Sequence, residues 1–188
     1  MKILKKIILF TFILTISWNL LHTAEFSKED AKRIDAFLKK AKKMNRKEMF
    51  LRKITFTEKE FNSYINLIYV KRYAPEAKYV RLNLERKNAV SGEVKLKLIG
   101  KKYDKIPGFL KDITLEFAGK VECEDYKMRL LFSKITINGT EYNPQVLDEA
   151  FAAYQVKQKV KKSMFDWFKL LPGLRNVVIT KRKITLYY

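Results

Sequence analysis

Apolar and polar residues alternate along most of the chain between residues 80 and 137. Because successive side chains of a β-strand point to opposite faces, this alternation predicts strands with one apolar and one charged face. Two-residue turn candidates divide these runs, and a final pair at the C-terminus, into antiparallel hairpins. The turn candidates are Lys87-Asn88, Glu124-Asp125, Asn138-Gly139 and Lys181-Arg182. The sequence therefore predicts an antiparallel sheet of seven or eight hairpin-connected strands, whose apolar face needs a cover.

Two positions interrupt the alternation. Gly92 lies inside the run 90–98 and predicts a bulge or a bend. After Phe132 the apolar positions change parity, so that Ile135 continues the pattern one residue out of step. Such a slip moves side chains to the other face unless one residue is left unpaired, and it predicts a β-bulge at Ser133-Lys134.

The cover for the sheet is predicted upstream, where a strand leads directly into a helix. Residues 50–56 alternate as a strand, and Thr57 stands three residues before Glu60, the spacing of a capping box. The helix that follows carries apolar and aromatic residues at i, i+3, i+4, i+7 and i+8, which places them on one face. These residues are Phe61, Tyr64, Ile65, Ile68 and Tyr69. We expect the strands to cover this face, and the helix to end before Pro75.

The first 24 residues are typical of a secretory signal peptide. Three lysines precede an apolar run over residues 7–18, and Ala24 offers a cleavage site. The run is short for a membrane span, but His22 departs from the usual cleavage pattern, so an uncleaved anchor is the alternative. Cleavage after Ala24 removes three basic and no acidic residues, which lowers the net charge from +20 to +17. We expect an exported protein of the periplasm or cell envelope.

We expect residues 25–47 to form a basic helical arm between the signal and a single α+β domain over residues 48–188. Ser27 is a candidate N-cap, and apolar residues then recur at helical spacing among many lysines. Two interpretations are open: the apolar face packs against the domain, or the helix lies on an anionic membrane surface. The membrane contacts of the second interpretation are Lys39, Lys40, Lys42 and Lys43.

A second helical region is predicted after the last turn of the long hairpins. Asn143 is a good N-cap and Pro144 a good first helical residue. The apolar positions change face near Gln155, which predicts two helical pieces, the second ending at Pro172-Gly173. The end of the second piece is rich in large apolar residues: Phe165, Trp167, Phe168, Leu170 and Leu171.

The residues that most catalytic and metal sites need are scarce. His22 is the single histidine and lies in the signal, and Cys123 is the single cysteine. The mature chain therefore lacks the usual zinc ligands and the Ser-His-Asp and Cys-His arrangements. We expect no enzyme, no catalytic residues, no metal and no cofactor. Basic residues interleave with aromatic ones, as in nucleic-acid-binding proteins, but the export signal argues against a nucleic-acid partner.

The segment FTEKEFNSYI over residues 56–65 resembles the strand-to-helix opening T-E-x-E-L-N of small exported bacterial proteins related to the tubular lipid-binding (TULIP-like) group. The amphipathic hairpins, Asn143-Pro144 and Leu-Pro-Gly-Leu over residues 171–174 are similar too. Phe61 stands where leucine is commoner. The resemblance covers residues 51–188 and implies a curved antiparallel sheet wrapped around a long amphipathic helix, with an apolar groove for acyl chains.

The resemblance implies a lipid or other apolar ligand as partner, held at an anionic membrane surface. Ordinary core packing is the alternative for each residue expected to line the groove. The expected lining residues are Phe61, Tyr64, Ile65, Ile68, Phe109, Leu110, Phe151, Tyr154, Trp167 and Phe168. An envelope protein with a filled core and a basic face for anionic membrane or polymer is the alternative function.

Overall fold

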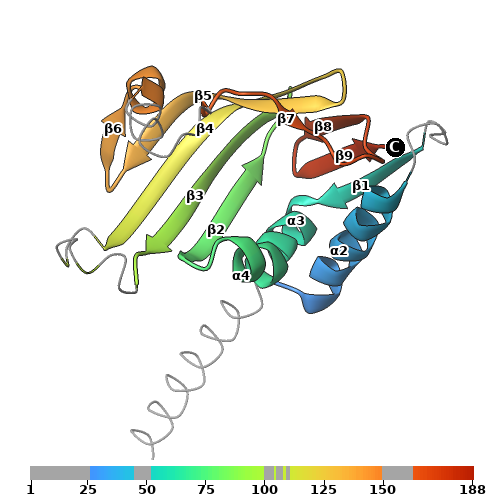
Figure 1. The fold of residues 1–188 in the computed structure, drawn as a ribbon, viewed down its shortest axis with the longest axis horizontal. Helices are drawn as coiled ribbons and strands as arrows, with labels where there is room; N and C mark the ends of the chain where they lie inside the picture. Colours follow the sequence, from blue (N-terminus) through green and yellow to red (C-terminus); the bar gives the residue numbers. More distant parts are fainter. Residues whose placement is uncertain (1–25, 45–51, 100–103, 105–107, 109–110, 150–162) are drawn as a thin grey trace, which may run out of the picture.

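The computed structural model describes residues 26–44, 52–99, 104, 108, 111–149 and 163–188, and these form an α+β fold of mostly antiparallel strands. The predicted class is confirmed. Instead of one sheet of seven or eight strands, the described residues form nine strands in two sheets, of six and three strands (Figure 1). The labelled helices are α2 (Lys28–Lys43), α3 (Glu58–Tyr64), the π-helical turn η2 (Ile65–Tyr69) and α4 (Val70–Tyr73), and residues 144–149 are also helical.

The larger sheet has the strand order β2-β3-β4-β5-β6, and β7 pairs with β5 beside this path. Its strands are β2 (Ala77–Leu84), β3 (Ala89–Lys97), β4 (Asp112–Glu124), β5 (Lys127–Ile137), β6 (Thr140–Tyr142) and β7 (Phe168–Lys169). The smaller sheet has the order β1-β9-β8, formed by β1 (Lys53–Thr57), β9 (Lys183–Tyr187) and β8 (Asn176–Thr180). The first described strand therefore pairs with the last.

Most of the predicted turns are confirmed by their backbone conformation. Left-handed φ angles occur at Lys87-Asn88 (59° and 61°) and at Asn138-Gly139 (48° and 82°), as type I′ turns require. Arg182 also has a positive φ, of 59°, between β8 and β9. The turn predicted at Glu124-Asp125 lies one residue later, because β4 extends through Glu124 and the positive φ angles fall on Asp125 and Tyr126.

The bulge predicted at Ser133-Lys134 is confirmed, whereas the strands pair without a bulge at Gly92. Ala118 pairs with Lys134 and Gly119 with Phe132, so Ser133 is the unpaired extra residue. Gly92 pairs regularly with Leu82 and Phe117. A Cβ at Gly92 would lie 2.7 Å from the Arg81 carbonyl and 2.9 Å from Cζ of Phe117. The glycine therefore serves close packing of an aromatic ring against the sheet.

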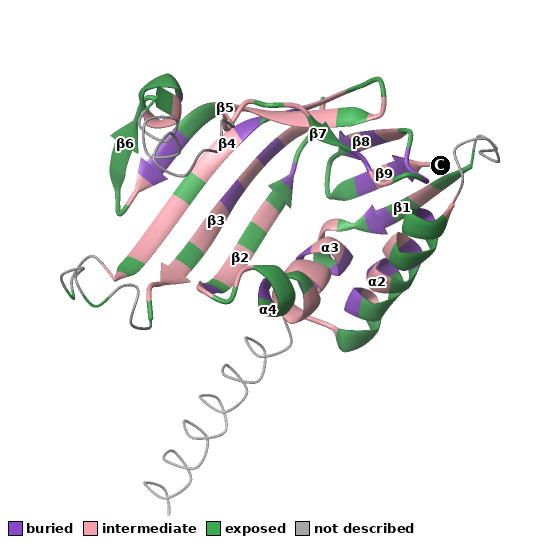
Figure 2. Cartoon of the chain, viewed as in Figure 1, coloured by how far each residue is buried: buried purple, intermediate pink, exposed green. Residues whose placement is uncertain are grey.

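One hydrophobic core joins the smaller sheet, α2 and the end of the larger sheet that lies close to β8. Phe56 of β1 is fully buried and packs against Phe37 of α2, with ring centroids 5.8 Å apart. Leu84, Val90 and Val121 of the larger sheet belong to the same cluster. The buried positions of β3 and β4 lie at the end of those strands near β8 (Figure 2).

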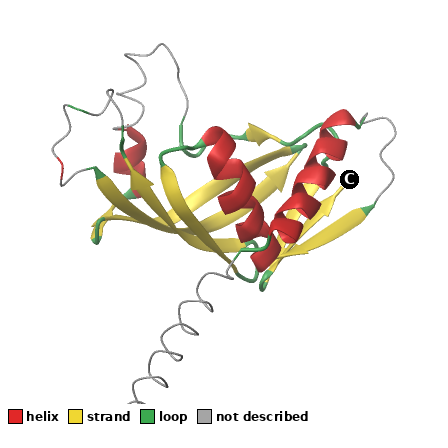
Figure 3. Ribbon diagram, turned by 90° about the horizontal axis from the view of Figure 1, so that it is seen from below, coloured by secondary structure: helices red, strands yellow, loops and turns green. Residues whose placement is uncertain are grey.

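The helix α2 packs its apolar face into the protein, as the first of the two interpretations expected. Ala31, Ile34, Phe37 and Ala41 are buried, and α2 lies beside the helical run over residues 58–73 (Figure 3). Ser27 caps the helix by accepting a hydrogen bond from the Asp30 backbone N–H. The apolar face of α2 is therefore occupied by protein contacts.

The helical run over residues 58–73 lies along the outer edge of β2, the edge that does not pair with β3. The side-chain oxygen of Asn62 accepts from the backbone N–H of Leu82 (2.8 Å) and its amide donates to the Leu82 carbonyl (2.8 Å). Asn66 makes the same two bonds to Val80, at 2.9 and 2.6 Å. A four-residue helical step of about 6 Å nearly matches two residues of strand, about 6.8 Å, so the helix pairs with β2 much as a strand would.

The last helical prediction is wrong at its C-terminal end, and the break expected near Gln155 lies outside the described residues. Residues 144–149 are helical, and the side chain of Asn143 accepts from the Gln145 N–H, as predicted. Residues 163–171, however, are turns and extended chain, and Phe168-Lys169 pairs with β5. The backbone of Gly173 donates to the Ala41 carbonyl at 2.9 Å, so Pro172-Gly173 packs against the end of α2 instead of ending a helix.

Candidate functional site

The larger sheet carries its apolar side chains on one face, because antiparallel partners point to the same side. Leu82 pairs with Gly92, Gly92 with Phe117, and Phe117 with Ile135 across four strands. The next row joins Val80, Val94, Leu115 and Ile137 in the same way. The opposite face is charged, with residues such as Lys95, Glu116 and Lys134.

This apolar face is covered at one end and partly exposed at the other. Near β8, Leu84 is 3% exposed, and the core closes over it. Further from β8, Ala77 and Ile135 are buried, but most of the other apolar side chains of β2, β3 and β4 are only half-buried. We call these residues the open apolar face: Val80, Leu82, Val94, Leu96, Ile113, Leu115 and Phe117.

A row of three aromatic rings borders the open apolar face. The ring centroids of Phe117 and Phe132 lie 5.9 Å apart, and those of Phe132 and Phe165 lie 6.2 Å apart, both in edge-on packing. The chain beside Phe165 is held by Asp148, whose carboxylate accepts from the Ser163 hydroxyl (2.8 Å) and the Met164 N–H (2.6 Å). These bonds tie the row to the helix over residues 144–149.

The six described residues that are predicted to line a groove lie in more than one place. Phe61 and Tyr64 pack against the core cluster, and Ile65 and Ile68 are half-buried in η2. Phe168 is 49% exposed and lies beside Met128 at the start of β5. The remaining four predictions, Phe109, Leu110, Phe151 and Tyr154, lie outside the described residues.

Trp167 lies on the charged face of the sheet and not with the apolar residues. Its ring is 4.4 Å from the Arg129 guanidinium carbon, a cation–π arrangement. Arg129 also pairs with the carboxylate of Glu122 at 2.8 Å, and both residues belong to the charged face. Both Trp167 and Phe168 are predicted to line the groove. In the extended chain that the structure has there, neighbouring side chains point in opposite directions.

The lysines predicted to contact a membrane are exposed near the end of α2. Lys39 pairs with Asp35 at 2.7 Å, and the other three have no hydrogen bond or ion pair within the described part of the chain. A 16-residue helix is about 24 Å long, so these lysines are far from Phe26, where the described chain begins.

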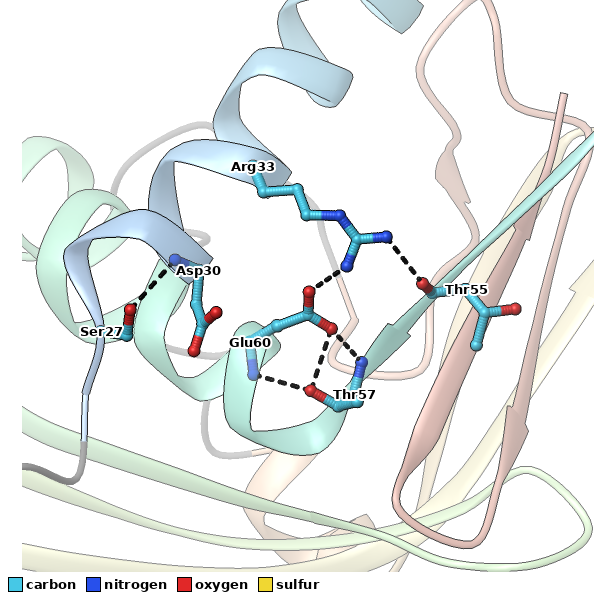
Figure 4. A network of polar contacts seen from close by, with 6 residues as sticks. All are labelled: Ser27, Asp30, Arg33, Thr55, Thr57 and Glu60. Atoms are coloured by element: carbon cyan, nitrogen blue, oxygen red, sulfur yellow. Dashed lines mark hydrogen bonds and ion pairs between the residues drawn. The ribbon is translucent and has the colours of Figure 1, made fainter.

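The capping box at the start of α3 is confirmed and extends into an ion pair. The Glu60 carboxylate accepts from the Thr57 backbone N–H (2.6 Å) and hydroxyl (2.9 Å), and also pairs with Arg33 of α2 (Figure 4). Burial alone would raise the pKa of Glu60, but these hydrogen bonds outweigh it and hold the pKa below its ordinary value. Glu60 is therefore an ionised structural group that joins α2 to α3.

Cys123 is a free thiol on β4, half-buried against the core cluster. Burial raises its pKa, so the thiol stays protonated at neutral pH and is a poor nucleophile. In the described residues, no group of three or more His, Cys, Asp and Glu side chains is placed to hold a metal ion. None of the helices in the described ranges is long and apolar enough to span a membrane.

Comparison of this chain with protein-family models, curated proteins and solved structures gave no match. The candidate site is therefore defined by the geometry of the chain itself.

Sequence reasoning missed the residues that border and form the open apolar face. The alternation predicts an apolar side for the strands that carry Leu115, Phe117 and Phe132, but the expected groove lining consists of helical and loop residues. The signal is present in the alternation, since alternate residues of β3 and β4 bring their apolar side chains to one face. Phe165 had no such signal, because its contact with Phe132 spans 33 positions of the chain.

Proposed function

We propose that this protein is an exported, non-catalytic binding protein that holds a lipid or another apolar ligand at the cell envelope. The observation that carries the proposal is the open apolar face, where β2, β3 and β4 present half-buried aliphatic side chains beside the aromatic row. Contiguous apolar surface of this kind commonly marks a binding site.

An acyl chain is a ligand that suits such a surface. Each buried CH₂ group contributes about 0.8 kcal/mol, so a chain of ten covered methylenes gains about 8 kcal/mol before the loss of its own freedom is subtracted. Among the described residues, every buried side-chain donor or acceptor already has a hydrogen-bond partner. None is therefore free on this surface to bind a polar ligand. Apolar contact is thus the main recognition that we propose.

The sheet and the helical run over residues 58–73 would form the walls of the binding site. In this proposal the larger sheet curves around the ligand, and Ile65 and Ile68, which are half-buried, complete one wall. Asn62 and Asn66 would then hold that wall against β2. The resemblance to tubular lipid-binding proteins likewise implies a curved sheet with an apolar groove for acyl chains.

The charge of the chain suits an anionic envelope membrane. The full sequence carries a net charge of +20, and Lys40, Lys42 and Lys43 are exposed and without ion pairs among the described residues. Lysines close to an anionic surface contribute on the order of 1 kcal/mol each. The signal-like segment over residues 1–24 supports export to that compartment.

The test is the binding of a fluorescent fatty acid by two matched variants. Leu115→Asn places an amide on the open apolar face, whereas Leu131→Asn makes the same change on the charged face of the neighbouring strand. We expect the first to weaken binding at least tenfold and the second to leave it within twofold, with the unfolding of both variants measured by urea. Equal binding by all three proteins would contradict the proposed site. Failure of the wild type to bind would favour the alternative of a filled core with a basic face.

A further inference from the structure

A hollow of about 540 Å³ lies where three separate elements meet, away from the open apolar face. The end of β2 comes close to the β8–β9 turn and to the start of α3 (Figure 1). The residues that line the hollow are Glu58, Arg81, Asn83, Leu84, Glu85, Arg86, Lys181 and Arg182.

The backbone around the hollow is held by hydrogen bonds between the three elements. The N–H of Arg182 donates to the Leu84 carbonyl at 2.8 Å, and the N–H of Glu58 donates to the Arg182 carbonyl at 2.9 Å. Asn88 joins the β2–β3 turn to β8, since its side chain accepts from the Ile179 N–H at 2.7 Å. Both turns that carry the cations are therefore fixed by contacts to the rest of the fold.

Four cationic side chains line the hollow without a partner in the described part of the chain. Arg81, Arg86, Lys181 and Arg182 are exposed, and their side chains make no hydrogen bond or ion pair to the described residues.

The two acids of the hollow are already engaged. Glu58 accepts from the Leu84 N–H at 2.6 Å, and Glu85 accepts from the Ser91 hydroxyl at 3.0 Å. The cations thus outnumber the carboxylates by two, and the carboxylates are bound to other groups.

We propose that this hollow binds a phosphate-bearing anion. Three of its cations are arginines, whose planar guanidinium groups bind phosphate oxygens in pairs. The anion is either a small phosphate compound or the phosphate of a lipid headgroup, because the two share this chemistry. The site is separate from the open apolar face and does not depend on a ligand there.

The experiment titrates the protein, purified from its own host, with inorganic phosphate and, in a second arm, with vesicles of phosphatidylglycerol or phosphatidylcholine. The test variant is Arg86→Gln combined with Lys181→Gln, and Lys87→Gln serves as a control in the same turn, outside the lining. Each lost charge-assisted contact weakens binding roughly tenfold, so we expect a loss of about a hundredfold in the double variant and within threefold in the control.

The two arms identify the source of the phosphate. Binding of inorganic phosphate that the double variant loses supports a site for small phosphate compounds, and loss of binding to phosphatidylglycerol vesicles alone supports a lipid headgroup. Equal loss in the control, or no binding in either arm, would overturn the proposal. Fatty-acid binding by the double variant is expected to stay at the wild-type level, so this result and that of the proposed function are independent.

Discussion

At the scale of single residues, the polar side chains of residues 57–66 connect their segment to α2 and to the edge of β2. Thr57 caps α3, Glu60 completes the cap and pairs with Arg33, and Asn62 satisfies the outer edge of β2. The stripe predicted to face the strands is only half-buried, because the row formed by Glu58, Asn62 and Asn66 faces β2. Unpaired strand edges are a site of aggregation, and this row covers one.

Replacement of Asn62 tests this edge pairing. Asn62→Ala leaves the N–H and C=O of Leu82 without their partners, and we expect it to lower the free energy of unfolding by about 2 to 4 kcal/mol. The control is Asn83→Ala on the same strand, whose exposed side chain makes a single long bond, and we expect less than about 0.5 kcal/mol. Urea denaturation measures both. An equal loss in the two variants would show that the edge pairing adds no stability.

The capping box makes stability depend on pH in the acidic range. The pKa of Glu60 is lowered on folding, so its ionised form stabilises the protein above the unfolded pKa of about 4.3. This contribution is lost as the pH falls through the lower pKa of the folded state. We expect Glu60→Gln to be less stable than the wild type at pH 7, and the difference to shrink below about pH 4. A difference in urea denaturation that is the same at pH 7 and pH 3 would contradict this role.

At the scale of elements, the features that could be predicted from the sequence are local ones. The turns at Lys87-Asn88 and Asn138-Gly139, the bulge at Ser133 and the cap at Thr57 each depend on a few neighbouring residues, and all are confirmed. Residues 163–171 have a helical apolar pattern but become extended, because Phe168 pairs with Met128 forty positions earlier in the chain. Such pairing with a distant strand overrides the local pattern.

Deletion of Ser133 tests the function of the bulge in β5. Without the extra residue, Lys134 follows Phe132 directly, so Phe132 stays opposite Gly119 and Ile135 stays opposite Phe117, both on the apolar side. We expect this deletion to change the free energy of unfolding by less than about 1 kcal/mol. Deletion of Leu131 instead places Ser133 opposite Gly119 and turns Phe132 to the charged face, and we expect it to cost at least about 3 kcal/mol in the free energy of unfolding. Similar denaturation midpoints for the two variants would contradict this explanation.

At the scale of the whole molecule, the class of the fold was predicted but its division into two sheets was not. The smaller sheet depends on pairing Lys53 with Tyr187, near the two ends of the domain, and no local pattern reveals that contact. The same division leaves the larger sheet covered at one end and open at the other. The candidate site follows from this uneven cover, which the local pattern of the sequence does not predict.

The central claim is that the open apolar face holds a lipid, and native mass spectrometry of the protein purified from its host without detergent tests it most directly. We predict a population whose mass exceeds that of the chain by one lipid, and the loss of that population in Leu115→Asn but not in Leu131→Asn. A single mass equal to that of the chain alone, both as purified and after incubation with lipids of the host, would contradict the claim.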